Sequence, residues 1–170
     1  MSFMELAKDR YSVRKFSDKA VEQEKIEQIL EAAIVAPTAC NNQPFKVWVI
    51  ESEEALAKMR EVTPCHFDAK VIFAVGGNKE EGWVRKLDQK SFVDVDASIV
   101  ATQMMLAIHD LGLGTTWVGW FDNDKLMERF PEMKDYSVVA LFPVGYPAED
   151  AAPAEMHTKY RPYEELIARL

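Results

Sequence analysis

The pattern of apolar and polar positions is dominated by one segment, Ala97–Leu111, in which the apolar residues leave only a narrow polar stripe. A helix that is apolar on most sides is buried on most sides, so this segment predicts a central helix. Asp96 is placed to cap its start, and Gly112 is placed to end it in a left-handed conformation. The next residues, 113–120, predict a turn into a short strand whose glycines let a flat group approach the backbone. On these residues alone, an ordinary core helix that stops at a glycine is the simpler interpretation.

Helical spacing and capping signals predict further, shorter helices over Phe3–Lys8, Glu24–Ala36, Glu53–Val62, Asp122–Phe130 and Tyr163–Leu170. Runs of β-branched and aromatic residues predict strands over Phe45–Ile50, Lys70–Gly76 and Ser137–Gly145. Pro143 in the last of these suggests an edge strand or a bulge, because proline cannot donate to a ladder. The polar segment Lys79–Phe92 is a candidate for a mobile lid.

Composition and charge restrict the class of protein. A chain of 170 residues with 48% hydrophobic and 28% charged residues predicts one globular domain, 1–170, that buries about 70% of its unfolded surface. The first ten residues lack the apolar core of a signal peptide, so we expect the cytoplasm. A net charge of −8 argues against nucleic-acid or anionic-membrane partners. Cys40 and Cys65 match no metal or disulfide spacing, and we expect no metal site.

A basic run after the first helix is the first candidate for chemistry. It contains Arg10, Tyr11, Ser12, Arg14 and Lys15, and it is either a solvated face or an anion site. The planar fork of arginine suits phosphate, and a serine hydroxyl can complete the shell. Charges more than about 8 Å apart are largely screened at physiological salt, so a local basic cluster can hold an anion in an acidic protein.

A polar loop after the second predicted helix is the second candidate. It contains Pro37, Thr38, Ala39, Asn41 and Gln43, and it leads into the first predicted strand. Amide side chains carry both donors and acceptors, which suits them to the edge of a heterocycle, although asparagine is also common in plain turns. The sequence has no G-x-G-x-x-G motif and no P-loop lysine, so a Rossmann site and a nucleotide phosphate loop are not expected.

Taken together and in this order, these segments resemble the FMN-dependent nitroreductase family. The resemblance rests on the basic run, the proline-led amide loop, the apolar helix that ends in Gly112–Gly114, and a second basic pair, Lys159 and Arg161. It implies an α+β fold with a mixed sheet flanked by helices. It also implies a homodimer with the long central helix in its core and FMN at the interface.

The resemblance assigns roles to individual residues. Ser12, Arg10 and Arg14 match a segment that contacts the phosphate and one side of the flavin, with Tyr11 between them, and Lys159 and Arg161 match the C-terminal phosphate pair. The loop residues Pro37, Thr38, Ala39, Asn41 and Gln43 match the loop that the partner subunit offers to the flavin. Trp117, Val118 and Gly119 match the backbone against the ring, with the Gly119 N–H as a candidate donor to flavin N5.

The expected function is that of an oxidoreductase that passes hydride from NADH or NADPH through FMN to a nitroaromatic, a quinone or a similar small flat acceptor. Arg14 and Gly119 are the expected catalytic residues, because a cation near the reduced flavin stabilises its negative charge. A second phosphate ligand is the alternative role for Arg14. The alternative functions are a flavin-binding sensor or carrier without efficient turnover, and a family member with different chemistry, such as reductive dehalogenation or oxygen-dependent flavin cleavage.

Overall fold

A four-stranded sheet forms the centre of the computed structural model, which describes residues 2–170. Its strands follow the order β1 (Phe45–Ile50), β2 (Val71–Asn78), β6 (Tyr136–Gly145) and β5 (Gly114–Thr115). The α+β class is as expected, but the sheet predicted to be mixed is antiparallel in all three of its strand pairings. Among residues 2–170, the one parallel pairing is an isolated bridge between Ser12 and Thr115.

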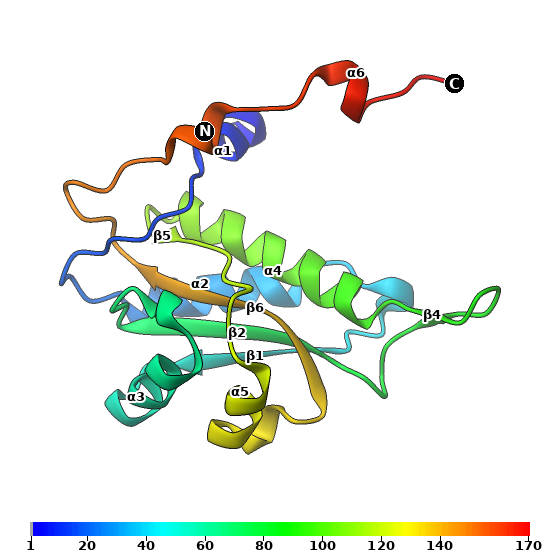
Figure 1. The fold of residues 1–170 in the computed structure, drawn as a ribbon, viewed down its shortest axis with the longest axis horizontal. Coiled ribbons are helices and arrows are strands. Elements are labelled where there is room, and N and C mark those ends of the chain that lie inside the picture. The colour runs from blue at the N-terminus through cyan, green and yellow to red at the C-terminus, as the bar shows by residue number, and fades with distance from the viewer. Residues whose placement is uncertain (1) are drawn as a thin grey trace.

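Helix α4 (Val93–Asp110) lies against one face of the sheet, where α2 (Gln23–Ile34) packs beside it (Figure 1). Its buried residues include Val100, Met104 and Ile108, which confirms the predicted central helix. Gly112 follows with a φ of 73°, the left-handed end that was expected. The cap prediction is wrong: α4 begins before Asp96, which is therefore a helical residue buried inside the fold.

The other face of the sheet is covered by α3 (Glu53–Val62) and α5 (Asn123–Arg129) (Figure 1). Strand residues alternate between the two faces, as the period of a strand requires. Phe73 and Phe142 pack toward α4, whereas Ile72 and Leu141 pack toward α3 and α5. The sheet is thus the middle of three layers, and both of its faces are buried.

Pro143 does not mark an edge strand. Strand β6 lies between β2 and β5, and its irregularity falls opposite Val75 and Gly76 rather than at the proline. Strand β5 pairs only with Val144 and Gly145, so the ladder on this side stops beside Pro143. The missing proline N–H is therefore accommodated at the end of a ladder inside the sheet.

The remaining elements lie at the periphery. They are α1 (Phe3–Asp9), η1 (Ala39–Asn41), η2 (Pro64–His66), β3 (Val84–Arg85), β4 (Lys90–Ser91), η3 (Pro131–Met133), η4 (Glu155–Thr158) and α6 (Tyr163–Leu166). Helix α6 is shorter than predicted, because the backbone is already extended at Ile167. Between Ser2 and Leu170, no helix has the length and apolar composition needed to cross a bilayer.

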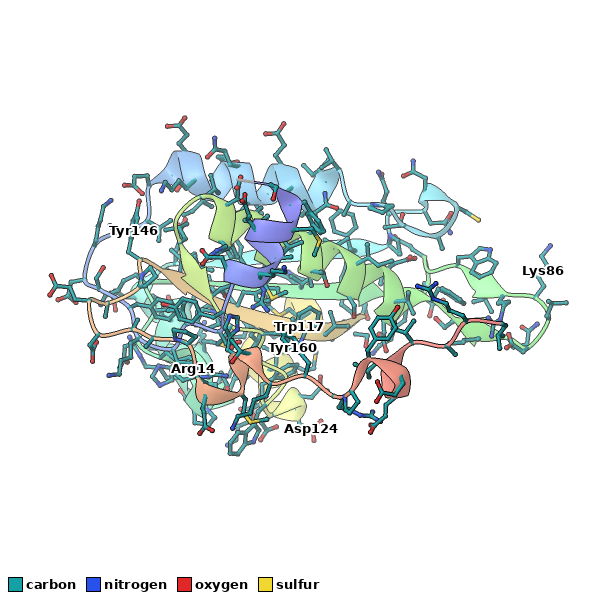
Figure 2. The ribbon with its side chains drawn as sticks, turned by 90° about the horizontal axis from the view of Figure 1, so that it is seen from above. Arg14, Lys86, Trp117, Asp124, Tyr146 and Tyr160 are labelled. Atoms are coloured by element: carbon teal, nitrogen blue, oxygen red, sulfur yellow. The ribbon has the colours of Figure 1, made fainter. Side chains whose placement is uncertain are left out.

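The segment that was a candidate lid forms a small hairpin of β3 and β4. The ring of Trp83 meets that of Phe92 edge-on, with centroids 4.9 Å apart, and this contact closes the base of the hairpin. Figure 2 shows Lys86, at the tip of the hairpin, at one end of the molecule and Arg14 in the opposite half. The hairpin therefore lies away from the basic run of its own chain, and its role as a lid stays a prediction.

Candidate functional site

The N-terminal basic segment is fixed to the sheet by its one apolar residue. The Val13 N–H donates to the Thr115 carbonyl at 2.9 Å, and the Val13 side chain is buried. That side chain fills the space over Gly114, where an added Cβ would lie 2.6 Å from Val13 Cγ2. Side chains alternate along an extended segment, so burial of Val13 leaves Ser12 and Arg14 on the opposite side.

A hollow of about 260 Å³ lies beside this segment. It is lined by Tyr11, Ser12, Arg14, Lys15, Asp150, Ala151, Ala152 and Ala154. The Arg14 guanidinium is exposed, and its Nη1 donates to the Ser12 carbonyl at 3.2 Å. Lys15 Nζ lies 2.5 Å from a carboxylate oxygen of Asp150, and this lysine lowers the pKa of the Asp150 carboxyl. Arg14, Lys15 and Ser12 thus supply a donor set suited to an anion, and an anion bound there would replace the Asp150 carboxylate as the partner of Lys15.

The segment that leaves β5 presents backbone next to open space. Trp117 is half-buried with its ring edge-on to Phe142, and Val118 is held by a pair of hydrogen bonds to Leu141. Gly119 is exposed, with no atom within 4 Å of the place a Cβ would take. The exposed Trp120 follows it, with its carbonyl accepting the Thr63 hydroxyl at 2.6 Å. The backbone at Gly119 is therefore both held in place and accessible to a flat group.

The loop Pro37–Gln43 has an unusual backbone. Cys40, Asn41 and Gln43 all have positive φ angles, between 50° and 55°. The Thr38 side chain accepts the Gln43 N–H at 3.0 Å, and Asp96 Oδ1 accepts the Ala39 N–H at 2.8 Å. The loop is thus a constrained structure and not a plain connection.

The two C-terminal cations lie in a different setting. Lys159 pairs with Glu155, and Arg161 Nη2 lies 2.9 Å from a Glu165 carboxylate oxygen. Within residues 2–170 neither cation contacts the N-terminal basic segment. The tail passes α1 and then leaves the body of the molecule, as Figure 1 shows for α6. The structure therefore brings together Tyr11, Ser12 and Arg14, but it does not join the two basic groups.

The sequence analysis gave two residues of this region no role in the site. Lys15 was named as part of the basic run, but the family resemblance assigned it no contact, and it lines the hollow. Asp96 was noticed only as a helix cap, and no sequence signal links it to a loop 57 residues earlier. Only the packing of α4 against that loop reveals the contact.

The chain is similar to known proteins over nearly its whole length. The profile of the nitroreductase family matches residues 7–68 and 64–146. A Methanothermobacter thermautotrophicus protein whose name proposes an NADH dehydrogenase or NAD(P)H nitroreductase is 32% identical, over 88% of this chain and 80% of its own.

Solved structures agree with the sequence match. A nitroreductase family protein from Clostridium difficile superposes with a TM-score of 0.92 at 36% identity, covering 99% of this chain and 98% of the other. A Desulfovibrio desulfuricans protein, described as a proposed nitroreductase in complex with FMN, gives a TM-score of 0.79 at 27% identity, covering 98% and 95%. The chain belongs to the nitroreductase family.

Proposed function

We propose that this protein is an FMN-dependent oxidoreductase that passes hydride from NADH or NADPH to a nitroaromatic, a quinone or a similar flat acceptor. One observation carries the proposal: the basic hollow lies beside an N-terminal segment that bridges to Thr115 of β5, and the accessible backbone at Gly119 follows β5 in the chain. The similar Desulfovibrio protein in complex with FMN supports the choice of flavin. The names of the relatives support a nicotinamide donor.

The residues present fit FMN. The phosphate needs cations and hydrogen-bond donors, because its charge is costly to remove from water unless it is paired. Ser12, Arg14 and Lys15 line the hollow and offer these groups. In the proposal Arg10, which comes just before them in the chain, joins them, and Lys159 and Arg161 complete the set when the tail is rearranged. The flat ring needs an approach free of side chains, and Gly119 offers one.

When bound, FMN supplies the hydride chemistry, so this chain needs few side chains that act as acids or bases. The protein then has to bind the flavin, orient its ring and shield it from water. Trp117 and Val118 fix the backbone that faces the ring, and the Gly119 N–H is the proposed donor to its N5. The loop residues Pro37, Thr38, Ala39, Asn41 and Gln43 are proposed to contact the flavin from the partner subunit.

The proposal includes a homodimer. Val95 and Ile99 on α4 are each 38% exposed, and with Pro37 and Leu106 they line a hollow of about 650 Å³ on the outer face of the helix. Large apolar side chains are also exposed along the tail, at Tyr160, Tyr163, Leu166, Ile167 and Leu170. A second copy of the chain would cover both surfaces, since obligate interfaces resemble a core cut in half.

Sedimentation tests the dimer. We expect a dimer at micromolar concentration and its dissociation in Ile99→Glu, which places a charge on the outer face of α4. A stable, flavin-loaded monomer of the wild-type protein would contradict this part of the proposal.

The function is tested by the visible spectrum of the protein with FMN and by its anaerobic bleaching with NADH and, separately, NADPH. Reoxidation by a nitroaromatic and by a quinone then ranks the acceptors. A wild-type protein that does not bind FMN overturns the proposal. A protein that binds FMN but is reduced only slowly by both nicotinamides is a sensor or carrier.

A further inference from the structure

The loop Pro37–Gln43 holds a backbone conformation that its residues do not favour by themselves. Cys40, Asn41 and Gln43 have φ angles of 53°, 55° and 50°, in the left-handed region where a Cβ is penalised. Three such residues within one short loop persist only when their surroundings determine the conformation. The contacts that hold the loop are therefore informative.

Most of the hydrogen bonds that hold the loop are internal to it. The Thr38 carbonyl accepts the Asn41 N–H, the Ala39 carbonyl accepts the Asn42 N–H, and the Thr38 hydroxyl accepts the Gln43 N–H. Bonds of this kind shape the loop but do not place it in the molecule. Asn42 Nδ2 donates to the Glu81 carbonyl at 3.3 Å, but that contact is exposed.

The bond to Asp96 is different because it ties the loop to the core. Asp96 is 1% exposed and stands in the first turn of α4, and its Oδ1 accepts the Ala39 N–H at 2.8 Å. The helix around it is fixed by buried neighbours such as Ala97 and Val100. Asp96 is therefore a rigid point to which the loop is attached.

The buried carboxylate of Asp96 is expected to lower the stability of the fold. Its Oδ2 is buried and has no hydrogen-bond partner within residues 2–170. A buried carboxylate with one donor is costly, even though the start of a helix favours negative charge. An apolar residue at this position would avoid that cost. A buried polar group that is only partly satisfied calls for a functional explanation.

We propose that Asp96 is a positioning residue that fixes the loop Pro37–Gln43 in the conformation that contacts the flavin. The inference rests on the proposed FMN function, and it assigns Asp96 no contact with the flavin itself. Asp96 acts through the Ala39 N–H, which orients the left-handed residues that follow it.

Two measurements on the whole protein test this inference. Amide exchange of Ala39, followed by NMR, reports the hydrogen bond without any cofactor, and FMN titration reports the consequence. The variants are Asp96→Ala and Asp96→Leu, which cannot accept the bond, and Asp96→Asn, which can. Asp124→Ala is the matched control, because Asp124 is also a first-turn aspartate but is exposed on α5 (Figure 2).

We expect Asp96→Ala and Asp96→Leu to speed Ala39 exchange and to weaken FMN binding about 10-fold or more, which corresponds to about 1.4 kcal/mol. Asp96→Asn should restore both readouts, and a merely structural loss would not be rescued in this residue-specific way. Asp124→Ala should behave as the wild type. Asp96→Leu keeps the test decisive if Asp96→Ala does not fold, because buried sites often accept an apolar residue of similar size.

Unchanged Ala39 exchange in Asp96→Leu would overturn the inference. So would faster exchange with unchanged FMN affinity, because the loop would then be fixed by Asp96 without serving the flavin. A wild-type protein that binds no FMN would instead overturn the proposed function, and Ala39 exchange would still decide whether Asp96 holds the loop.

Discussion

The two basic ends of the chain differ in how firmly the fold holds them. The N-terminal segment is fixed to the sheet by buried Val13, so Ser12 and Arg14 face the hollow before any ligand arrives. At the C-terminal end every residue from Thr158 to Leu170 is exposed, and Arg161 is paired with Glu165. The backbone that carries the first group of cations is held in place, and the backbone that carries the second is not.

This difference bears on how a phosphate would be held. A phosphate held near a fixed backbone costs less ordering of the chain. Arg161 must first give up its contacts with Glu165, as Lys15 must give up its contact with Asp150, whereas among residues 2–170 Arg14 hydrogen-bonds only the Ser12 carbonyl. Exposed ion pairs are worth about 0–1 kcal/mol, so that exchange is inexpensive. In the proposed function the N-terminal segment therefore defines the phosphate site, and the tail would close it once another surface, such as a second copy, orders the tail.

The broadest effect, on both stability and FMN binding, is expected where the N-terminal segment meets the sheet. Gly114→Ala would place a Cβ 2.6 Å from Val13 Cγ2, and this steric overlap should cost about 1–3 kcal/mol of unfolding free energy. It should also displace Ser12 and Arg14 and weaken FMN binding. Urea unfolding and FMN titration measure the two effects.

The double variant Val13→Ala/Gly114→Ala is the control for that prediction. Removing the Val13 methyl groups frees the space that the new Cβ needs, so the double variant should recover part of the loss. Neighbouring residues typically show coupling energies of about 0.5–3 kcal/mol. Strictly additive effects would show that Val13 does not hold the segment in place.

The second prediction compares the two ends directly. Arg10→Ala and Arg161→Ala should each weaken FMN binding by about 1.5–3 kcal/mol, because a hydrogen bond to a charged phosphate is lost. This corresponds to about 10- to 100-fold in the dissociation constant. Arg129→Ala is the control, since Arg129 pairs with Glu61 on the α3–α5 side. If both site variants keep FMN as tightly as the wild type, the phosphate assignment is wrong.

Much of the fold follows from the hydrophobic pattern. The predicted helix Glu53–Val62 and strand Phe45–Ile50 are confirmed with the same bounds, because their ends carry clear local signals such as the Ser52 cap. The antiparallel sheet was not predictable, because strand direction is decided by how the connections pack. The position of β6 inside the sheet likewise depends on β5, which is too short to have a pattern.

In the candidate site, too, features with a local sequence signal were predicted, and features that depend on long-range packing were not. The basic segment and the amide loop were predicted as candidates from residues that lie close together in the sequence, and the predicted role of Gly119 came from the family resemblance of its segment. The contact of Asp96 with Ala39 was not predicted, because any residue except proline can donate its backbone N–H, so the residue type at position 39 does not reveal the hydrogen bond. A capping residue and a buried acceptor look identical in sequence, and only the start of α4 separates them.

The third prediction concerns Arg14, which lies on the backbone that is held in place. Negative charge on the reduced flavin is stabilised by a nearby cation, so Arg14→Gln should lower the two-electron midpoint potential while the protein keeps its FMN and fold. A drop of some tens of millivolts is expected, where about 30 mV corresponds to about 1.4 kcal/mol. Spectroelectrochemistry measures this drop, with Lys86→Gln, far from Arg14 at one end of the molecule, as the control (Figure 2). An unchanged potential with weaker FMN binding would assign Arg14 to the phosphate instead.

The smallest effect concerns a hydrogen bond between Glu22, in the N-terminal region, and Tyr146, which directly follows β6. The Tyr146 hydroxyl donates to Glu22 at 2.6 Å, and this bond, with help from Lys19, lowers the pKa of the exposed Glu22 carboxyl from 4.5 to about 2. Because the folded-state pKa is lowered, the stabilising contribution is present above about pH 4.5 and is lost as the pH falls toward 2.

Tyr146→Phe should raise the pKa of Glu22 toward its ordinary value and make unfolding stability less dependent on pH between about 5 and 3. NMR titration of the Glu22 carboxyl and urea unfolding at both pH values measure this, and Glu54, whose pKa is lowered by Lys58 on α3, should titrate unchanged. The same Glu22 pKa in Tyr146→Phe would mean that the hydroxyl is not its cause.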